Sequence, residues 1–242
     1  MINKPSIAIT VLVLLLLSLS SNAQIKQGMI VFERKTNLYK KFKDSENIKE
    51  WLKEEDKIKV DLFELWFNDT TSLYKPQDSE LREYNAWATD KNTVRQYLST
   101  GKIYMIRQIW EEEVHISDSL TKRKWKLTSS TRKIAGYNCR KAVWQINDSL
   151  RIYAWFSYDI VVPTGPENFG GLPGTILGLA TEDGGLVYFA KKVVLTPPTP
   201  MDLEIKKKKS ATSRAELIQA LTKKYGHEKW FKRELHRNFD LY

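Results

Sequence analysis

The chain contains little cysteine and histidine for its 242 residues: one cysteine and three histidines. The single cysteine, Cys139, excludes an internal disulfide, so the fold must depend on its hydrophobic core. We expect Cys139 to be a small buried apolar group rather than a reactive thiol. His227 and His236 do not have the i, i+4 spacing of a zinc-binding helix. These shortages argue against a disulfide scaffold and a histidine-rich metal centre.

Several catalytic motifs are also missing. The chain has no GxGxxG or GxxxxGK[ST] loop for phosphates and no GxSxG nucleophile elbow. Glu113 and His115 would share one face of a strand, where they could bind a metal or move a proton, but a charged strand edge explains them equally well. We therefore predict no catalytic residue, no cofactor and no metal, and a protein that is not an enzyme.

Acidic pairs offer only a weak signal for hydrolysis. Asp159 with Glu167, or Glu182 with Asp183, could flank a glycosidic bond. A chain with 29 carboxylates offers many such pairs by chance. A hydrolase that uses scattered carboxylates or His115 therefore stays a minor alternative.

Long hydrophobic runs are absent except at the start. Lys4 precedes an apolar run from Ile7 to Leu17, and small residues follow up to Ala23. This is the layout of a secretory signal peptide, and the run is shorter than the roughly 20 residues of a spanning helix. We predict a signal peptide over 1–23, cleavage after Ala23, and a periplasmic or secreted protein that is not membrane-spanning once mature.

The remaining residues, 24–242, suit a single domain. The formal net charge of the whole chain is +10, partly from the runs Lys122–Lys124 and Lys206–Lys209. We interpret these runs as solvated loops and expect no nucleic-acid partner for an exported protein.

Short apolar-alternating segments joined by polar turns predict a large, mostly antiparallel sheet. A few helices accompany it, including one near the C-terminus, where Ser213 and Glu216 have capping-box spacing. The fold class is α+β, mostly β, with one curved sheet. Strands are expected over 27–38, 57–68, 93–98, 102–110, 137–146, 150–157, 175–181 and 186–195, with others beginning near 114 and 125, and helices over 44–55, 213–225 and 227–239.

Two details of this pattern concern which side chains face the core. Ile58, Val60 and Leu62 share one face, and the apolar phase then changes at Phe63, which predicts a bulge or a strand buried on both sides. Trp144, Tyr153 and Trp155 lie on adjacent strands and are candidates for a concave binding face, although core packing is the ordinary explanation.

Four pieces in order carry a family resemblance: Met29–Glu33, Ile134–Ala142, Ala154–Ser157, and the stretch from Gly165 that includes Phe169 and Gly171–Leu177. The chain resembles the GLPGLI family, exported and largely uncharacterised proteins of Bacteroidetes-type bacteria. Thr175 stands where that family has leucine. The resemblance implies export and a β-rich GLPGLI-type domain over 24–242 with a helical C-terminal extension. The layout is also loosely similar to the lipoprotein-carrier fold, a sheet curved around a hydrophobic concavity.

The prolines and glycines of this stretch also predict its backbone conformation. Pro173 restricts its own φ and favours an extended Leu172, while the glycines permit positive φ. Phe169 and Leu172 can plug into the sheet. We expect an ordered loop that is a shape-determining connector, a rim over an apolar pocket or, last, a catalytic turn. The family-motif residues that could form a ligand rim are Phe169, Gly171, Leu172, Pro173, Gly174, Thr175 and Ile176.

These features lead to a cell-envelope protein that binds or carries an apolar or amphipathic partner such as a lipid or peptide. The alternative is an interaction protein that docks on an outer-membrane protein. A carrier predicts a deep apolar cavity, whereas a docking protein predicts an exposed apolar patch or a free sheet edge.

Overall fold

The computed structural model describes residues 24–77, 85–109, 112–147, 150–208, 210–228, 230–232 and 235. The predicted signal peptide, residues 1–23, lies outside these ranges, and so does the end of the helix predicted over 227–239. Within the described residues, none of the helices has the length and apolar content that a bilayer crossing requires.

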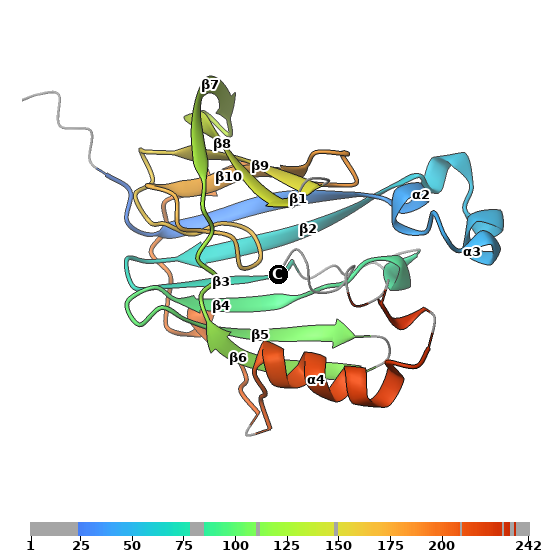
Figure 1. The fold of residues 1–242 in the computed structure, drawn as a ribbon. Helices are drawn as coiled ribbons and strands as arrows, with labels where there is room; N and C mark the ends of the chain where they lie inside the picture. The colour runs from blue at the N-terminus through green and yellow to red at the C-terminus, as the bar shows by residue number, and fades with distance from the viewer. Residues whose placement is uncertain are drawn as a thin grey trace, which may run out of the picture.

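Eleven strands form one sheet in the order β6-β5-β4-β3-β2-β1-β11-β10-β9-β8-β7, and all neighbours pair antiparallel (Figure 1). The large antiparallel sheet predicted from the alternating pattern is confirmed. The strands are β1 (Gly28–Asn37), β2 (Ile58–Phe67), β3 (Thr71–Pro76), β4 (Thr93–Tyr97), β5 (Lys102–Ile109), β6 (Glu112–Ser119), β7 (Lys126–Ile134), β8 (Tyr137–Asn147), β9 (Leu150–Ser157), β10 (Thr175–Thr181) and β11 (Leu186–Val194).

The two edge strands, β6 and β7, follow each other in the sequence. The segment 120–125 therefore runs across the front of the sheet from one edge to the other (Figure 1). This crossing segment brings its side chains to the inner face of the sheet, where the candidate site lies.

The helices are few, as predicted. The helix predicted over 44–55 is divided, because Leu52 has extended backbone angles (φ −82°, ψ 119°) that end the first piece. The helices are α2 (Leu38–Lys41), α3 (Glu46–Trp51) and α4 (Arg214–Tyr225), with 3₁₀ turns η1 (Glu54–Asp56), η2 (Ala86–Ala88) and η3 (Met201–Leu203).

The predicted capping box of α4 is confirmed. The Ser213 hydroxyl accepts a hydrogen bond from the Glu216 backbone N–H at 3.2 Å, and the Glu216 carboxylate accepts one from the Ser213 N–H at 2.8 Å. These bonds satisfy two of the backbone donors that a helix start leaves without partners.

We expect Ser213→Ala to lower the free energy of unfolding by about 1 kcal/mol, the usual value of a serine cap. The measurement is urea denaturation followed by circular dichroism. Ser129→Ala, at an exposed strand position, is the control and should change little. Equal midpoints for the two variants would contradict a stabilising cap.

The inner face of the sheet holds the main core. Alternate residues of most strands point to it, whereas β7 buries only Ile134. Its fully buried members include Ile30, Phe32, Phe63, Leu65, Phe67, Phe156, Ile176 and Leu179. On the opposite, outer face, Leu203 and Ile205 of the segment after β11 cover Leu73 and Tyr104.

The structure corrects the prediction for β2. The pairing of β2 with β1 runs without a break from Ile58 to Phe67, so there is no bulge at Leu62. Phe63, Leu65 and Phe67 face the core, whereas Ile58, Val60 and Leu62 face outward and are 44%, 46% and 41% exposed. The strand is therefore not buried on both sides, and the change of apolar phase marks an exposed apolar row.

Candidate functional site

The glycine-proline stretch Gly165–Gly174, here called the plug loop, belongs to the connection from β9 to β10 and enters the core. Phe169 is 1% exposed and Leu172 is 2% exposed, and both belong to the main hydrophobic cluster. The Gln96 amide donates to the carbonyl oxygens of Glu167 (3.2 Å) and Phe169 (3.3 Å). The plug loop thus inserts into the sheet, as the sequence predicted for Phe169 and Leu172.

The end of the plug loop requires its glycines. Gly171 has φ +81° and Gly174 has φ +151°, angles that disfavour other residues. A Cβ on Gly174 would collide with the Ser157 carbonyl oxygen, while Gly171 has open space around it. Thr175 is fully buried, and its hydroxyl donates to the Val162 carbonyl at 2.6 Å. The buried hydroxyl of Thr175 therefore has a polar partner.

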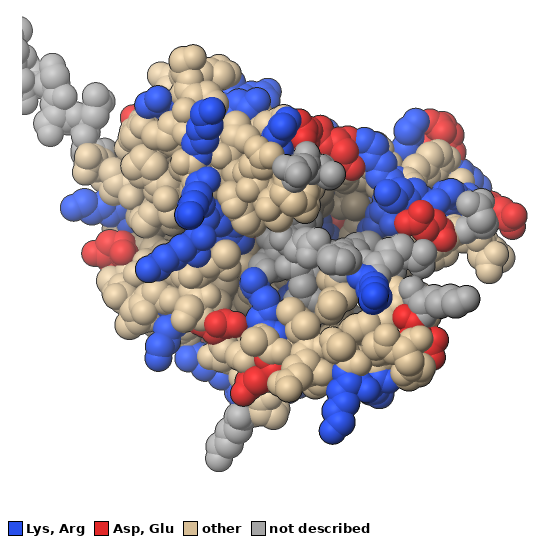
Figure 2. All heavy atoms as spheres, in the orientation of Figure 1, with Lys and Arg blue, Asp and Glu red and all other residues tan. Residues whose placement is uncertain are grey.

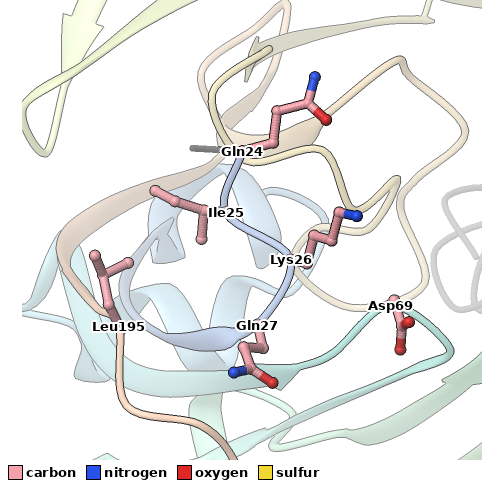
Figure 3. Close-up of a pocket in the computed structure, with 6 residues that line it drawn as sticks. All are labelled: Gln24, Ile25, Lys26, Gln27, Asp69 and Leu195. Carbon is pink, nitrogen blue, oxygen red and sulfur yellow. The ribbon is translucent and has the colours of Figure 1, made fainter. Parts of the chain in front are cut away.

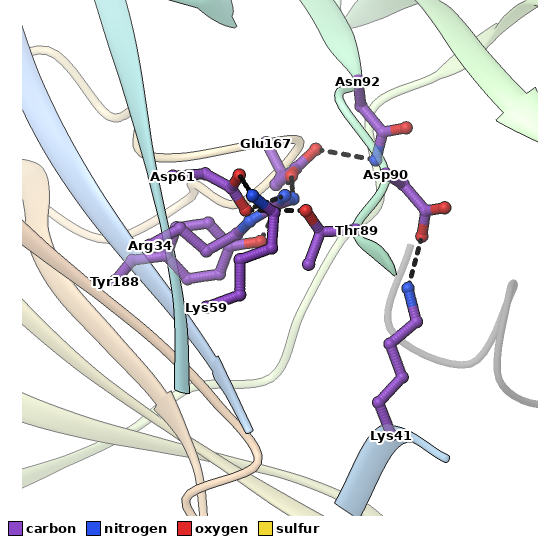
Figure 4. A network of polar contacts seen from close by, with 9 residues as sticks. All are labelled: Arg34, Lys41, Lys59, Asp61, Thr89, Asp90, Asn92, Glu167 and Tyr188. Atoms are coloured by element: carbon purple, nitrogen blue, oxygen red, sulfur yellow. Dashed lines mark hydrogen bonds and ion pairs between the residues drawn. The ribbon is translucent and has the colours of Figure 1, made fainter. Parts of the chain in front are cut away.

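Glu167 anchors the plug loop through a buried polar network (Figure 4). It is fully buried and has φ +55°, a strained angle for glutamate. Its carboxylate accepts hydrogen bonds from Tyr188 (3.1 Å) and Asn92 (3.2 Å), and the Arg34 guanidinium lies 3.7 Å away. Arg34 also pairs with Asp61 at 2.8 Å. The loop is thereby tied to β1, β2 and β11.

Burial and charge pairing oppose each other in this network. Burial raises the pKa of Glu167, more than the nearby Arg34 lowers it. For Asp61, burial raises the pKa, but the Arg34 charge and hydrogen bonds from Arg34 and Thr89 outweigh it and hold the pKa below its usual value. Burial lowers the pKa of Arg34. The larger, opposite effect of Tyr188, Tyr74, Glu167 and Asp61 leaves it above its usual value. The guanidinium stays charged and holds the two carboxyl groups together.

This network is closed to solvent. The side chains of Arg34, Asp61 and Glu167 are 4%, 0% and 0% exposed. A general acid or nucleophile must reach its substrate, so these carboxyl groups serve the fold. Glu167 contacts Arg34 and not Asp159 among the described interactions, so the acidic pair Asp159–Glu167 does not form a site.

At the rim of the plug loop, Arg123 from the crossing segment lies between two aromatic rings. Its guanidinium carbon is 4.3 Å from the centroid of Phe169 and 5.0 Å from that of Trp144. It donates to the Asn168 backbone carbonyl (2.9 Å) and side-chain oxygen (2.8 Å). Burial, with a smaller effect of Arg214, lowers the pKa of Arg123 to about 9. Arg123 fastens the crossing segment to the plug loop.

The three aromatic candidates for a concave face do not share one surface, and this prediction is wrong. Trp144 pairs with Ile152 on the inner face and packs against Trp125, with ring centroids 6.2 Å apart. Tyr153 and Trp155 alternate with the buried residues of β9 and lie on the outer face. There Lys141 lies 3.9 Å from the Tyr153 ring. The period of two in β9 separates these residues from Trp144.

Glu113 and His115 do come together, at 2.9 Å, and the other ring nitrogen of His115 contacts the Tyr104 hydroxyl at 2.9 Å. Lys208 bonds to Glu113 through its ammonium and to Tyr104 through its backbone N–H, both at 2.7 Å. His115 is 6% exposed. The group therefore attaches the segment after β11 to β5 and β6. In the described part of the chain, no cluster of three metal-ligating side chains occurs.

Cys139 is fully buried, as the sequence analysis expected. Burial raises the pKa of its thiol to about 11, so the reactive thiolate is scarce at neutral pH.

An open depression of about 500 Å³ lies at the end of the sheet where the described chain begins (Figure 3). Its lining comes from the segment before β1, the turn after β2 and the end of β11. Leu195 there is 57% exposed. The lining residues are Gln24, Ile25, Lys26, Gln27, Asp69 and Leu195. This shallow, mixed surface differs from the deep apolar cavity that a carrier requires.

Sequence reasoning missed the residues that hold the plug loop, above all Arg34 and Asp61. The signal was present in the alternation of β1 and β2. Arg34 continues the inward series of Ile30 and Phe32, and Asp61 precedes Phe63 on the same face. A charge at an inward position of each of two paired strands indicates a buried ion pair.

Comparisons with known proteins show where this fold occurs. Two crystal forms of PNGF-II match with a TM-score of 0.54, at 19% and 20% identity. Each match covers 80% of this chain but only 32% of PNGF-II, so the chain spans about a third of that protein. An uncharacterized conserved protein from Thermus thermophilus aligns over 84% of this chain and 98% of its own at 8% identity and a TM-score of 0.40. No curated protein gives a significant match. At 19% and 20% identity the similarity to PNGF-II concerns the fold.

Comparison with protein-family models identifies a family as well as a fold. The model of the N-glycanase peptide N-terminal domain matches residues 83–219. This range includes the crossing segment, the plug loop and the first half of α4. The predicted resemblance to the GLPGLI family stays a prediction. Since the matched range covers more than half of the 242 residues, the chain belongs to the family of N-glycanase peptide N-terminal domains.

Proposed function

We propose that this protein is an exported, non-enzymatic binding protein of the cell envelope that docks an apolar or amphipathic partner on the outer face of its sheet. The observation that carries the proposal is the apolar row Ile58, Val60 and Leu62 on β2, whose members are 41–46% exposed. Single exposed apolar residues are ordinary, but neighbours on one strand face form a continuous surface.

Charged pairs lie beside the apolar row. On the neighbouring strand β1, Lys35 is paired with Val60 and Glu33 with Leu62. Glu33 in turn forms ion pairs with Lys35 and Lys191, both at 3.1 Å. An apolar centre with a charged border is typical of a protein–protein contact surface and suits an amphipathic partner.

The inner face supports docking over carriage of an apolar ligand inside the sheet. Phe169 and Leu172 of the plug loop already occupy the inner core. The buried ion pairs of Arg34 hold this loop in place. A ligand inside the sheet would have to displace a loop tied by buried charges, which costs several kcal/mol.

The match to PNGF-II does not carry glycan cleavage to this chain. The name N-glycanase describes a relative of which the chain spans only 32%. We therefore propose a binding role, and we propose export through the signal peptide over 1–23. Intact mass spectrometry of protein from the periplasm or medium tests cleavage after Ala23.

Site-specific photocrosslinking tests the docking face. A photoreactive phenylalanine analogue replaces Val60 in the producing bacterium, and the same analogue at exposed Lys102, on β5, is the control. We expect a discrete adduct from position 60 alone. Adding Leu62→Glu should remove most of that adduct, because a carboxylate in an apolar contact costs about 2 kcal/mol or more.

Other results decide against the proposal. An adduct that survives Leu62→Glu would show that the apolar row is not the contact. A lipid or peptide in the native mass spectrum of the mature protein, with no adduct at position 60, would favour the carrier.

A further inference from the structure

The two edges of the sheet differ in whether another segment pairs with their backbone. Thr212 pairs with the outer side of β6. Its backbone N–H donates to the His115 carbonyl (3.0 Å), and its carbonyl accepts from the Ser117 N–H (2.9 Å). At the other edge, β7 pairs with β8 and with no other described strand. In the described residues, no backbone hydrogen bond from outside this hairpin reaches Lys126–Ile134. One edge is covered and the other is open.

The crossing segment and the β7–β8 hairpin carry basic side chains and no acidic ones in their first 22 residues, 120–141. Between residues 120 and 141 the sequence has eight lysines and arginines and no aspartate or glutamate. Lys122, Lys124, Lys126 and Lys133 are exposed. We call β7 together with these four lysines the basic edge. Figure 2 shows Lys and Arg side chains following the course of β7 in the orientation of Figure 1.

These lysines differ from most of the others on the sheet. Lys75 pairs with Glu64 at 3.1 Å, and Lys191 pairs with Glu33 at 3.1 Å. Among the described ion pairs, none includes a lysine of the basic edge. The charge of this edge is thus left for a partner to neutralise.

The two ends of β7 give a partner access to the backbone. The pairing with β8 is interrupted between Leu127 and Thr131, and there the Thr128 carbonyl accepts from Arg140 at 2.7 Å and the Ser130 N–H donates to the Thr128 hydroxyl oxygen at 3.2 Å. On either side of this interruption, residues 126–127 and 131–134 pair with β8 and receive no other described backbone hydrogen bond. Unpaired backbone groups at a sheet edge are a template for another strand.

We propose that the basic edge binds an extended acidic peptide segment of another protein by strand addition. The partner's backbone would pair with β7, and its carboxylates would lie against the lysines. This site is separate from the apolar row and goes beyond the proposed docking face. Lysines also protect edge strands from pairing, so the experiment must separate attraction of an acidic strand from protection alone.

The test uses the mature chain and a fluorescent peptide of about ten residues with alternating glutamate and valine. A second peptide, with proline in place of valine, keeps the charge but loses the backbone donor at every second residue and has its φ restricted there. Fluorescence anisotropy measures the dissociation constant, and hydrogen exchange measures protection of amides in 126–134. We expect the first peptide alone to bind and to slow exchange at alternate residues of β7.

Charge reversal locates the site. Lys124→Glu/Lys126→Glu should weaken binding roughly ten-fold or more, because attraction becomes repulsion. Lys43→Glu/Lys192→Glu makes the same change of net charge at exposed positions elsewhere and should change binding less than about two-fold. Thermal melting of both variants checks that they fold.

Three results would overturn the proposal. Equal binding of the proline peptide would mean charge attraction without strand pairing. Equal loss of affinity in both double variants would place the effect in net charge. Absence of peptide binding, with or without binding to vesicles of anionic phosphatidylglycerol, would leave the lysines as edge protection or as a membrane contact.

Discussion

Arg34→Met should lower the free energy of unfolding by about 3–5 kcal/mol, since it removes the cation that two buried carboxyl groups share, and Lys59, 3.4 Å from Asp61, and Arg107, near Glu167, compensate only in part. Arg34 bonds to Asp61 at 2.8 Å and lies 3.7 Å from Glu167, and all three side chains are nearly inaccessible. The plug loop depends on this contact, so the loss should appear as global destabilisation. Urea denaturation at about pH 7.5 measures it.

The loss should also depend on pH. In the native protein the lowered pKa of Asp61 contributes stability that is present above its unfolded pKa of about 3.9 and disappears as the pH falls through the folded value. Without Arg34, only Lys59 and the Thr89 hydroxyl oppose the effect of burial on Asp61, so we expect the pKa of both Asp61 and Glu167 to rise and the variant to regain stability as both become neutral. The difference between the two proteins should be smaller at about pH 4.5 than at about pH 7.5.

Arg151→Met is the matched control, because Arg151 pairs with Glu182 at 2.9 Å but both side chains are about 40% exposed. Its cost should be at most about 1 kcal/mol, with little dependence on pH. A loss for Arg34→Met no larger than that of the control would show that the buried network does not hold the loop.

Gly174→Ala should cost about 3 kcal/mol or more, while Gly171→Ala, three residues earlier, should cost about 1 kcal/mol. Both glycines have positive φ, so alanine is strained at both positions. Only at Gly174 does the new Cβ meet a backbone atom, the Ser157 carbonyl oxygen, which cannot move without breaking the β9–β10 pairing. The clash adds to the strain.

Thermal unfolding of the two variants beside the parent chain provides the comparison. The Gly174 variant should melt many degrees lower, or fail to accumulate as folded protein, and the Gly171 variant should remain close to the parent. If both variants melted at the same temperature, the close approach at Gly174 would not determine the loop.

The plug loop illustrates how far sequence reasoning reached. Pro173 and the glycines predicted an ordered loop, and Phe169 and Leu172 predicted its insertion, because these properties belong to the residues themselves. The role of Glu167 could not be predicted. It depends on Arg34, more than a hundred positions earlier, and on Tyr188, which only the pairing order β2-β1-β11 brings to one place.

The aromatic residues show the opposite outcome. Trp144, Tyr153 and Trp155 are close in the sequence, but the register Trp144↔Ile152 places Trp144 inside and the other two outside. Likewise, the shared face of Ile58, Val60 and Leu62 was predictable from their spacing. Its exposure was not, because it depends on which face of the sheet the plug loop fills.

By itself, the sequence determined the strand pattern, the large antiparallel sheet, the cap of α4 and the burial of Cys139. Each of these follows from local alternation, hydrogen bonding or the apolar character of one residue. Only the tertiary structure decided which face is the inside, which edge is open and which charges are buried together. Those properties arise from pairings between distant strands, and a local sequence pattern does not specify which strands will pair.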